Sequence, residues 1–254
     1  MIKRDKLIDF INRTLGVESD KDPYLFNGLQ VIGRDNVKKV VLGVSANLEL
    51  FEKAADWGAQ IIILHHGLFG PKSSSPITRV MKKRLKVLFD YDITLLTYHL
   101  FLDNHLVLGN NAQIIKLLGA KQGKKFGYSD KLYWGYEGEF SKPIAINELI
   151  KRAKKLCGFG VKVFKYGPEK IKKIGVVSGG GPYILYEAVN KNMDAFLTGE
   201  PRESTEAWVK EAGIHFFNLG HYNSEKFGIK ALGEVVKRKF PKLAIKFIDV
   251  PNSL

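Results

Sequence analysis

The chain has 254 residues and a formal net charge of +14, with 40 lysines and arginines against 26 aspartates and glutamates. This length can bury one large α/β core or two smaller ones. The single cysteine, Cys157, excludes a disulfide within one chain and a thiolate-rich metal cluster, so any metal must use histidine and carboxylate ligands. No apolar run approaches the roughly 20 residues that cross a bilayer, and we expect a soluble, cytoplasmic protein.

The first 120 residues alternate helix and strand patterns. Gly16 and Gly119 each end a predicted helix. Such alternation indicates a largely parallel sheet with helices on both faces. The predicted helices are 2–15, 47–58, 75–92 and 110–120, and the predicted strands are 37–45, 59–66 and 93–99.

The middle of the chain has another pattern. Residues 131–146 alternate like antiparallel strands, 147–159 read as a helix and 161–167 as a further strand. We therefore expect one structural unit built from three segments. These are a first α/β lobe (1–120), a short middle insert with antiparallel strands and one helix (121–173), and a second α/β lobe (174–254).

The second lobe repeats the plan of the first. Residues 174–200 follow the same order of strand, turn, helix and strand as residues 41–67. Aligning Ser178 with Ser45 also aligns Thr198 with His65, which indicates an internal duplication.

Polar and ionisable residues follow four apolar strand patterns. In open α/β sheets, ligands bind beyond the carboxyl ends of the strands. Imidazole and carboxylate ligands together suit Zn, Mn, Fe or Co, and a carboxylate can bridge two ions, so the pattern suggests a dinuclear metal site. The candidate residues are His65, His66, His99, Asp103, Glu200, His221 and Glu225.

Local geometry can bring some of these side chains together. His65 and His66 would point in opposite directions within a strand, but at its end the backbone turns and each can address a neighbouring metal. His221 and Glu225 are four residues apart, and Gly220 before them fits the start of a helix that carries both on one face.

Structural roles are the alternative for the same residues. His65 or His66 could cap the following turn, His99 could be a hydrogen-bonded core histidine, and Glu225 could be an exposed helix residue.

Two other histidines and one glycine-rich loop are expected to be structural. We assign His105 and His215 no role in the site. The sequence "VVSGGGP" (176–182) could cradle a phosphate, but it lacks the spacing of a dinucleotide fingerprint and the lysine of a P-loop. We interpret it first as a tight turn between strand and helix.

Seven motifs in order resemble the GTP cyclohydrolase I type 2 homolog family, also called Nif-three-like proteins, and most closely its short bacterial branch. The resemblance runs from about Asn27 to the closing "FIDVPN" at 247–252. The motifs are "NGLQV", "ILHHGLF", "YHLFLDNHLVLGNNAQ", "VVSGGG", "DAFLTGE", "LGHYNSEKFGIKAL" and "FIDVPN".

This resemblance implies a dinuclear metal centre between two similar α/β lobes. His66 and Asp103 would bind one ion, His65 and His221 the other, and Glu225 would bridge them. The ions would be two divalent cations per chain, from Zn, Mn, Fe, Co or Mg.

The resemblance also implies a role for His99, which falls on a pocket position where it could hydrogen-bond a water or substrate and act in catalysis. Leu100 and Phe101 replace the Thr and Asn of many relatives, and Ser45 stands where relatives often carry an acidic residue. Neither departure removes an implied ligand. The resemblance further implies a toroidal homohexamer, a trimer of dimers.

Three functions follow as hypotheses. The first is a metal-dependent hydrolase of an unidentified small molecule, and the second is a metal-handling protein without turnover. The third is a basic ring that binds nucleic acid or protein partners. Against the third, the basic runs 81–90, 147–159 and 231–242 interleave charges with apolar residues at helical spacing, which is typical of solvated helix faces.

Overall fold

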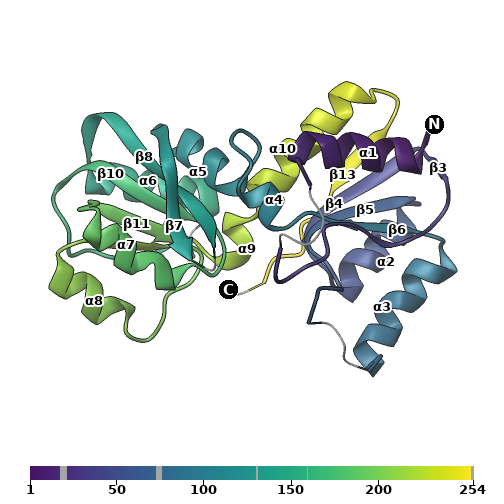
Figure 1. Ribbon diagram of the computed structural model, residues 1–254, viewed down its shortest axis with the longest axis horizontal. Helices are drawn as coiled ribbons and strands as arrows, with labels where there is room; N and C mark the ends of the chain where they lie inside the picture. Colours follow the sequence, from purple (N-terminus) through teal and green to yellow (C-terminus); the bar gives the residue numbers. More distant parts are fainter. Residues whose placement is uncertain (18–21, 73–75, 130, 159, 253–254) are drawn as a thin grey trace. The chain divides into compact units, whose positions relative to one another are not determined.

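The structure is a computed structural model that describes residues 1–17, 22–72, 76–129, 131–158 and 160–252. The chain folds into two compact units (Figure 1). Unit 1 comprises Met1–Leu102 and Ile229–Val250, and unit 2 comprises Asp103–Gly228 and Pro251–Leu254. No helix among the described residues is long and apolar enough to cross a bilayer.

Unit 1 contains a five-stranded sheet in the order β13-β4-β5-β6-β2. The first four strands are parallel and β2 is an antiparallel edge strand. A separate two-stranded ladder pairs β1 with β3. The strands are β1 (Ile2–Lys3), β2 (Gly28–Val31), β3 (Asn36–Val37), β4 (Lys39–Ser45), β5 (Ile61–His66), β6 (Thr94–Thr97) and β13 (Ala244–Phe247).

Helices cover both faces of this sheet. Figure 1 shows α1 and the later part of α10 on one face, and α2 and α3 on the other. Asn47 caps α2 by accepting a hydrogen bond from Leu50 N (2.8 Å), and Thr78 caps α3 through Met81 N (3.3 Å). The helices are α1 (Arg4–Leu15), α2 (Leu48–Asp56), α3 (Arg79–Asp90), α4 (Leu100–Asp103) and α10 (Lys226–Lys239).

Unit 2 contains a six-stranded sheet in the order β7-β8-β10-β11-β12-β9. Strands β10, β11 and β12 are parallel to one another, and β7, β8 and β9 pair antiparallel with their neighbours. The strands are β7 (Lys121–Ser129), β8 (Leu132–Ala145), β9 (Lys162–Phe164), β10 (Lys170–Val177), β11 (Ala195–Thr198) and β12 (His215–Asn218).

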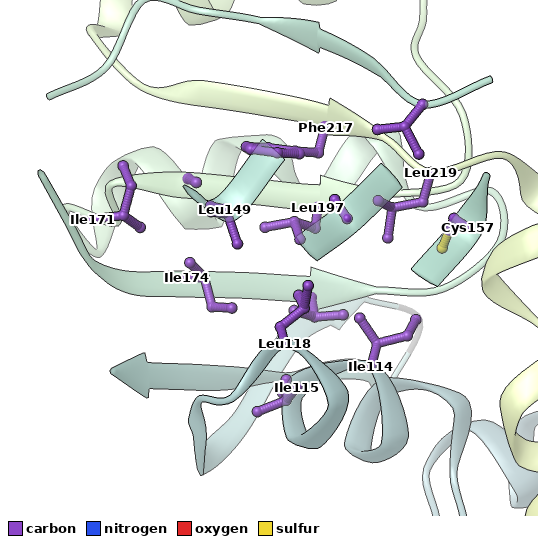
Figure 2. Close-up of a cluster of buried hydrophobic side chains, with 14 of the residues drawn as sticks. Ile114, Ile115, Leu118, Leu149, Cys157, Ile171, Ile174, Leu197, Phe217 and Leu219 are labelled. Atoms are coloured by element: carbon purple, nitrogen blue, oxygen red, sulfur yellow. The ribbon is translucent and has the colours of Figure 1, made fainter. Parts of the chain in front are cut away.

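Two apolar clusters fill the two faces of the second sheet. Figure 2 shows the first, in which Leu197 and Phe217 pack against Leu149 and Ile115 of the helices α6 and α5. The neighbouring residue Phe196 points to the opposite face, as strand alternation requires, and packs with α7 and α8. The helices are α5 (Asn110–Leu118), α6 (Ile146–Cys157), η1 (Pro182–Ile184), α7 (Leu185–Asn190), α8 (Thr205–Ala212) and α9 (His221–Ser224).

The two units share a strand-helix-strand element with the same register. Val41 pairs with Ile62 in unit 1, and Ile174 pairs with Ala195 in unit 2. These are equivalent pairs in the alignment of residues 41–67 with 174–200. The common register supports the predicted duplication.

The observed organisation differs from the predicted segments 1–120, 121–173 and 174–254. The strands of the middle segment, β7, β8 and β9, hydrogen-bond into the sheet of unit 2, and so they do not form a separate layer. The helix α5 packs in the core of unit 2, whereas the late strand β13 pairs with β4 in unit 1.

The secondary structure confirms an α/β fold with helices flanking the sheets, although both sheets are mixed rather than wholly parallel. The edge strand β2 has no counterpart among the predicted strands. Ser75 and Phe159, at the ends of two predicted helices, lie outside the described residues.

Candidate metal centre

Three histidines from unit 1 form a compact group at the carboxyl ends of β5 and β6. His65 and His66 end β5, and His99 follows β6. The ring centroids are 4.6 Å apart for His65 and His66, and 5.1 Å apart for His65 and His99. One ligand nitrogen from each residue lies within 4.8 Å of the others, so this three-histidine group could hold a metal ion.

The hydrogen bond of His65 sets its tautomer. Its Nδ1 lies 3.0 Å from the carbonyl oxygen of Tyr98, and the ring is fully buried. Because a carbonyl can only accept, Nδ1 carries the proton and Nε2 keeps its lone pair. This is the usual arrangement of a metal-binding histidine.

Asp22 holds His99 in the group. The Oδ2 atom of Asp22 accepts from His99 Nδ1 at 2.9 Å and from Asn27 Nδ2 at 2.9 Å, and Oδ1 accepts from Tyr24 N at 2.9 Å. Burial alone would raise the pKa of Asp22, but the hydrogen bond and charge of His99, with the other donors, hold it well below its ordinary value. The sequence offered no signal for Asp22, because it lies 77 residues from His99 in a segment without periodicity.

Asp103 belongs to unit 2 and is held by polar side chains around it. Its Oδ1 accepts from Asn110 Nδ2 at 2.8 Å and from Ser178 Oγ at 3.0 Å, and the side chain is only 5 % exposed. Asn111 in turn accepts from Ser178 N at 2.7 Å. The two buried asparagines therefore orient Asp103. The sequence analysis did not predict this role of the asparagines.

His221 lies between two carboxylates of the same unit. Its Nδ1 pairs with Glu200 Oε1, and its Nε2 lies 3.3 Å from Glu225 Oε2. Burial lowers the pKa of His221, but the hydrogen bonds and charges of Glu225 and Glu200 outweigh it and raise the pKa to about 9. The two carboxylates therefore favour the protonated form of His221.

The helix predicted to carry His221 and Glu225 is broken. The helix α9 ends at Ser224 and α10 begins at Lys226, so Glu225 lies between them with φ −109° and ψ 7°. The two side chains still meet, because the break keeps them about one turn apart. Oxygen atoms of Glu225 and Asp103 lie within 4.8 Å of each other. We refer to Asp103, Glu200, His221 and Glu225 as the acidic group.

The glycine-rich loop packs against the acidic group. Gly179 has φ +64°, and a Cβ atom there would collide with Glu225 Oε1. Its amide donates to Ser224 Oγ at 2.9 Å. The loop is thus the tight turn expected after β10, and its glycine leaves room for a carboxylate rather than for a phosphate.

The remaining histidines, His105 and His215, hydrogen-bond to nearby backbone groups. His105 Nδ1 accepts from the amides of Val107 (3.1 Å) and Leu108 (3.0 Å), which caps a turn. His215 Nδ1 accepts from Gly167 N at 3.2 Å, and its Nε2 donates to Pro168 O at 2.8 Å.

Each unit therefore supplies one part of the predicted ligand set. Unit 1 brings His65, His66 and His99 together, and unit 2 brings Asp103, Glu200, His221 and Glu225 together. Imidazole nitrogens and carboxylate oxygens are donors that first-row divalent ions accept, so both groups fit the chemistry of a metal site. The assembly of both groups into one dinuclear centre remains a prediction.

Comparisons with known proteins agree with the resemblance seen in the sequence. The family model described as Duf34/NIF3 (NGG1p interacting factor 3) matches residues 2–253. A GTP cyclohydrolase 1 type 2 homolog of Archaeoglobus fulgidus is 36% identical over 249 residues, which cover 98% of each chain. One of Escherichia coli K12 is 38% identical over 260 residues and 99% of each chain.

Solved structures show the same fold. A structure of the protein ybgI, described as of unknown function, matches with a TM-score of 0.91 and 35% identity over 100% of both chains. The structure of TTHA1606 from Thermus thermophilus matches with a TM-score of 0.88 and 31% identity, again over 100% of both chains.

We expect Gly179→Ala to destabilise unit 2 by about 1–3 kcal/mol, because the methyl group meets Glu225 and the backbone must keep a positive φ. Urea unfolding followed by circular dichroism measures the change. Gly180→Ala is the matched control, since the atom nearest to its new Cβ would lie at an ordinary contact distance of 3.6 Å. The free energy of unfolding should then change by no more than about 0.5 kcal/mol. Equal effects of the two substitutions would contradict the proposed packing.

We expect Asp22→Asn to lower the free energy of unfolding at pH 7 by about 1–3 kcal/mol, because a buried charged acceptor is lost. A carboxyl group with a lowered pKa stabilises the fold above its unfolded pKa of about 3.9 and loses that contribution as pH falls. Denaturation curves of the variant and the parent should therefore converge in acid. The exposed Asp56→Asn is the control, and a variant as stable as the parent at pH 7 would refute the role of Asp22.

Proposed function

We propose, from the premise that this chain belongs to the DUF34/NIF3 family, that it is a metal-dependent hydrolase with a dinuclear centre. The observation that carries the proposal is the pair of side-chain groups, three histidines in unit 1 and three carboxylates with one histidine in unit 2, each held close together. Charged and imidazole side chains are costly to bury without partners. Groups of this composition are therefore unusual in a protein core that has only a packing role.

In the proposed centre, both groups contribute ligands to a pair of divalent ions. His66 and Asp103 would hold one ion, His65 and His221 would hold the other, and Glu225 would serve both. The orientation of His65, whose Nε2 keeps its lone pair, and the approach of the Asp103 and Glu225 carboxylates support this assignment.

When bound, divalent cations would supply two kinds of chemistry, a lower pKa for a nearby water molecule and neutralisation of charge on the oxygens of a phosphate or amide substrate. The protein's own residues have separate tasks. Asp22 fixes the Nδ1 proton of His99, so that His99 Nε2 can accept or return a proton during hydrolysis. Glu200 holds the ring of His221 through Nδ1, which leaves Nε2 for the ion.

Histidine and carboxylate ligands accept Zn, Mn, Fe or Co, and Mg at the carboxylate positions. The relatives carry a name that refers to GTP, but we extend only a hydrolytic reaction to this chain. A cytoplasmic homohexamer, as a ring-shaped trimer of dimers, is part of the same proposal.

A metal-handling role without turnover uses the same residues and is the principal alternative. It predicts that the protein binds ions but processes no substrate. Binding of nucleic acid by the basic surface is the second alternative, and it predicts an affinity that falls steeply with salt and is indifferent to chelators.

We expect the protein loaded with Zn²⁺ or Mn²⁺ to hydrolyse at least one member of a panel of phosphoesters, nucleotides and cyclic amides. Glu225→Gln should reduce turnover by at least about a hundredfold, because the bridging charge is lost. Elemental analysis of the same samples should show close to two ions per parent chain and fewer in the variant.

Glu203→Gln is the matched control, because Glu203 is exposed and lies outside the acidic group. It should leave turnover and metal content unchanged. Ions bound without any turnover would favour the metal-handling role. Turnover that persists in Glu225→Gln, or in the presence of excess chelator, would contradict the hydrolase proposal.

A further inference from the structure

A cavity of about 320 Å³ lies in unit 2 outside both ligand groups. Its volume is at the lower end of the range of about 300–1,000 Å³ in which proteins bind small molecules. It opens between the segment η1–α7 on one side and the start of α8 on the other. The lining residues that matter here are Tyr183, Tyr186, Arg202, Ser204, Thr205 and Trp208.

Two aromatic side chains in the wall of the cavity remain substantially exposed to solvent. Tyr186 is 61 % exposed and Trp208 is 50 % exposed, although large aromatic residues usually bury most of their surface. Their rings make an edge-to-face contact with centroids 6.4 Å apart. Such a wall leaves aromatic surface on which a flat ring can stack.

Arg202 provides a positive charge at the cavity, beside a third aromatic ring. The guanidinium carbon of Arg202 lies 5.7 Å from the ring centroid of Tyr183. Trp134 makes an edge-to-face contact with the same tyrosine ring, with centroids 5.7 Å apart. Arg202 makes no ion pair with any described residue, so its charge is available to a ligand.

The backbone at Arg202 is fixed rather than loose. Its amide donates to Thr205 Oγ1 at 2.7 Å, and the amide of Thr205 donates back to Arg202 O at 3.1 Å. Thr205 is only 3 % exposed. This reciprocal turn at the start of α8 holds the arginine at the cavity, which favours binding because less freedom is lost.

We propose that this cavity binds a planar aromatic ring that carries an anionic group, a phosphate or a carboxylate. The ring stacks on Trp208 and Tyr186, and the anion pairs with Arg202. Aromatic walls alone would also suit an organic cation, but the arginine repels one. The site is separate from the proposed metal centre and requires no ion.

Isothermal titration calorimetry with four probes tests the proposal. AMP and nicotinate each combine a flat ring with an anion, whereas adenosine lacks the anion and inorganic phosphate lacks the ring. We expect AMP, nicotinate or both to bind at least about tenfold more tightly than adenosine and phosphate. Preference for AMP identifies a nucleotide as the ligand class, and preference for nicotinate identifies a small aromatic acid.

Substitutions locate the binding in this cavity. Trp208→Ala should weaken it by about 5-fold to 100-fold, the range expected for loss of one stacking partner. Arg202→Ala should weaken it as well, and Arg202→Lys should restore part of the affinity, because a lysine keeps the charge but not the planar fork. Both residues are exposed, so the fold should survive.

Two control variants exclude other surfaces. Tyr91→Ala removes a tyrosine of similar exposure in unit 1, and Lys155→Ala removes a charge from the basic groove between α5 and α6. Neither should change the affinity. Phosphate binding as tight as AMP and nicotinate, unchanged affinity in Trp208→Ala, or no binding of any probe at millimolar concentration would overturn the proposal. Glu225→Gln should bind the probes as the parent does, so a failed metal site leaves this test intact.

Discussion

The register of the parallel strands is the constraint on which both ligand groups depend. In unit 1, backbone pairing of β4, β5 and β6 brings the ends of three strands to one edge, where Ser45 pairs with His66 and the chain continues into His99. In unit 2, β10, β11 and β12 bring Ser178, Glu200 and His221 to the equivalent edge. Backbone hydrogen bonds thus bring these side chains together. Without the fold, repulsion between like charges and the cost of desolvation would oppose this arrangement.

Fixed hydrogen bonds orient three of the candidate ligand side chains. The carbonyl of Tyr98 sets the tautomer of His65, Asp22 sets that of His99, and Glu200 holds His221. A site prepared in this way loses little freedom on binding, which is the usual reason for such supporting contacts around metals.

The sequence predicted the parts of the site that lie at the ends of strong strand patterns. His65, His66 and His99 follow apolar runs, and the structure brings them together. Asp22 was missed because its hydrogen bond to His99 connects distant segments, and a lone aspartate in an irregular segment has no periodicity. The asparagines at the start of α5 were missed for another reason, since an amide at a helix start indicates a cap more often than a buried bond to a carboxylate.

Local patterns also failed where tertiary packing overrides them. The spacing of His221 and Glu225 predicted one helix. The helix is instead interrupted at Glu225, although the two side chains still contact each other. The alternation in 131–146 identified antiparallel strands correctly, yet gave no indication that β8 pairs with β10. Pairing partners depend on the whole sheet, and a single strand does not encode them.

The central claim is that five side chains, His65, His66, Asp103, His221 and Glu225, share a pair of metal ions. Anomalous X-ray diffraction from crystals of the protein soaked in Mn²⁺ or Zn²⁺ tests it most directly. The account predicts two anomalous peaks about 3.5–4 Å apart, with the Glu225 carboxylate between them. A map with no peak at these side chains, or with a single ion that contacts neither His65 nor Glu225, would contradict it.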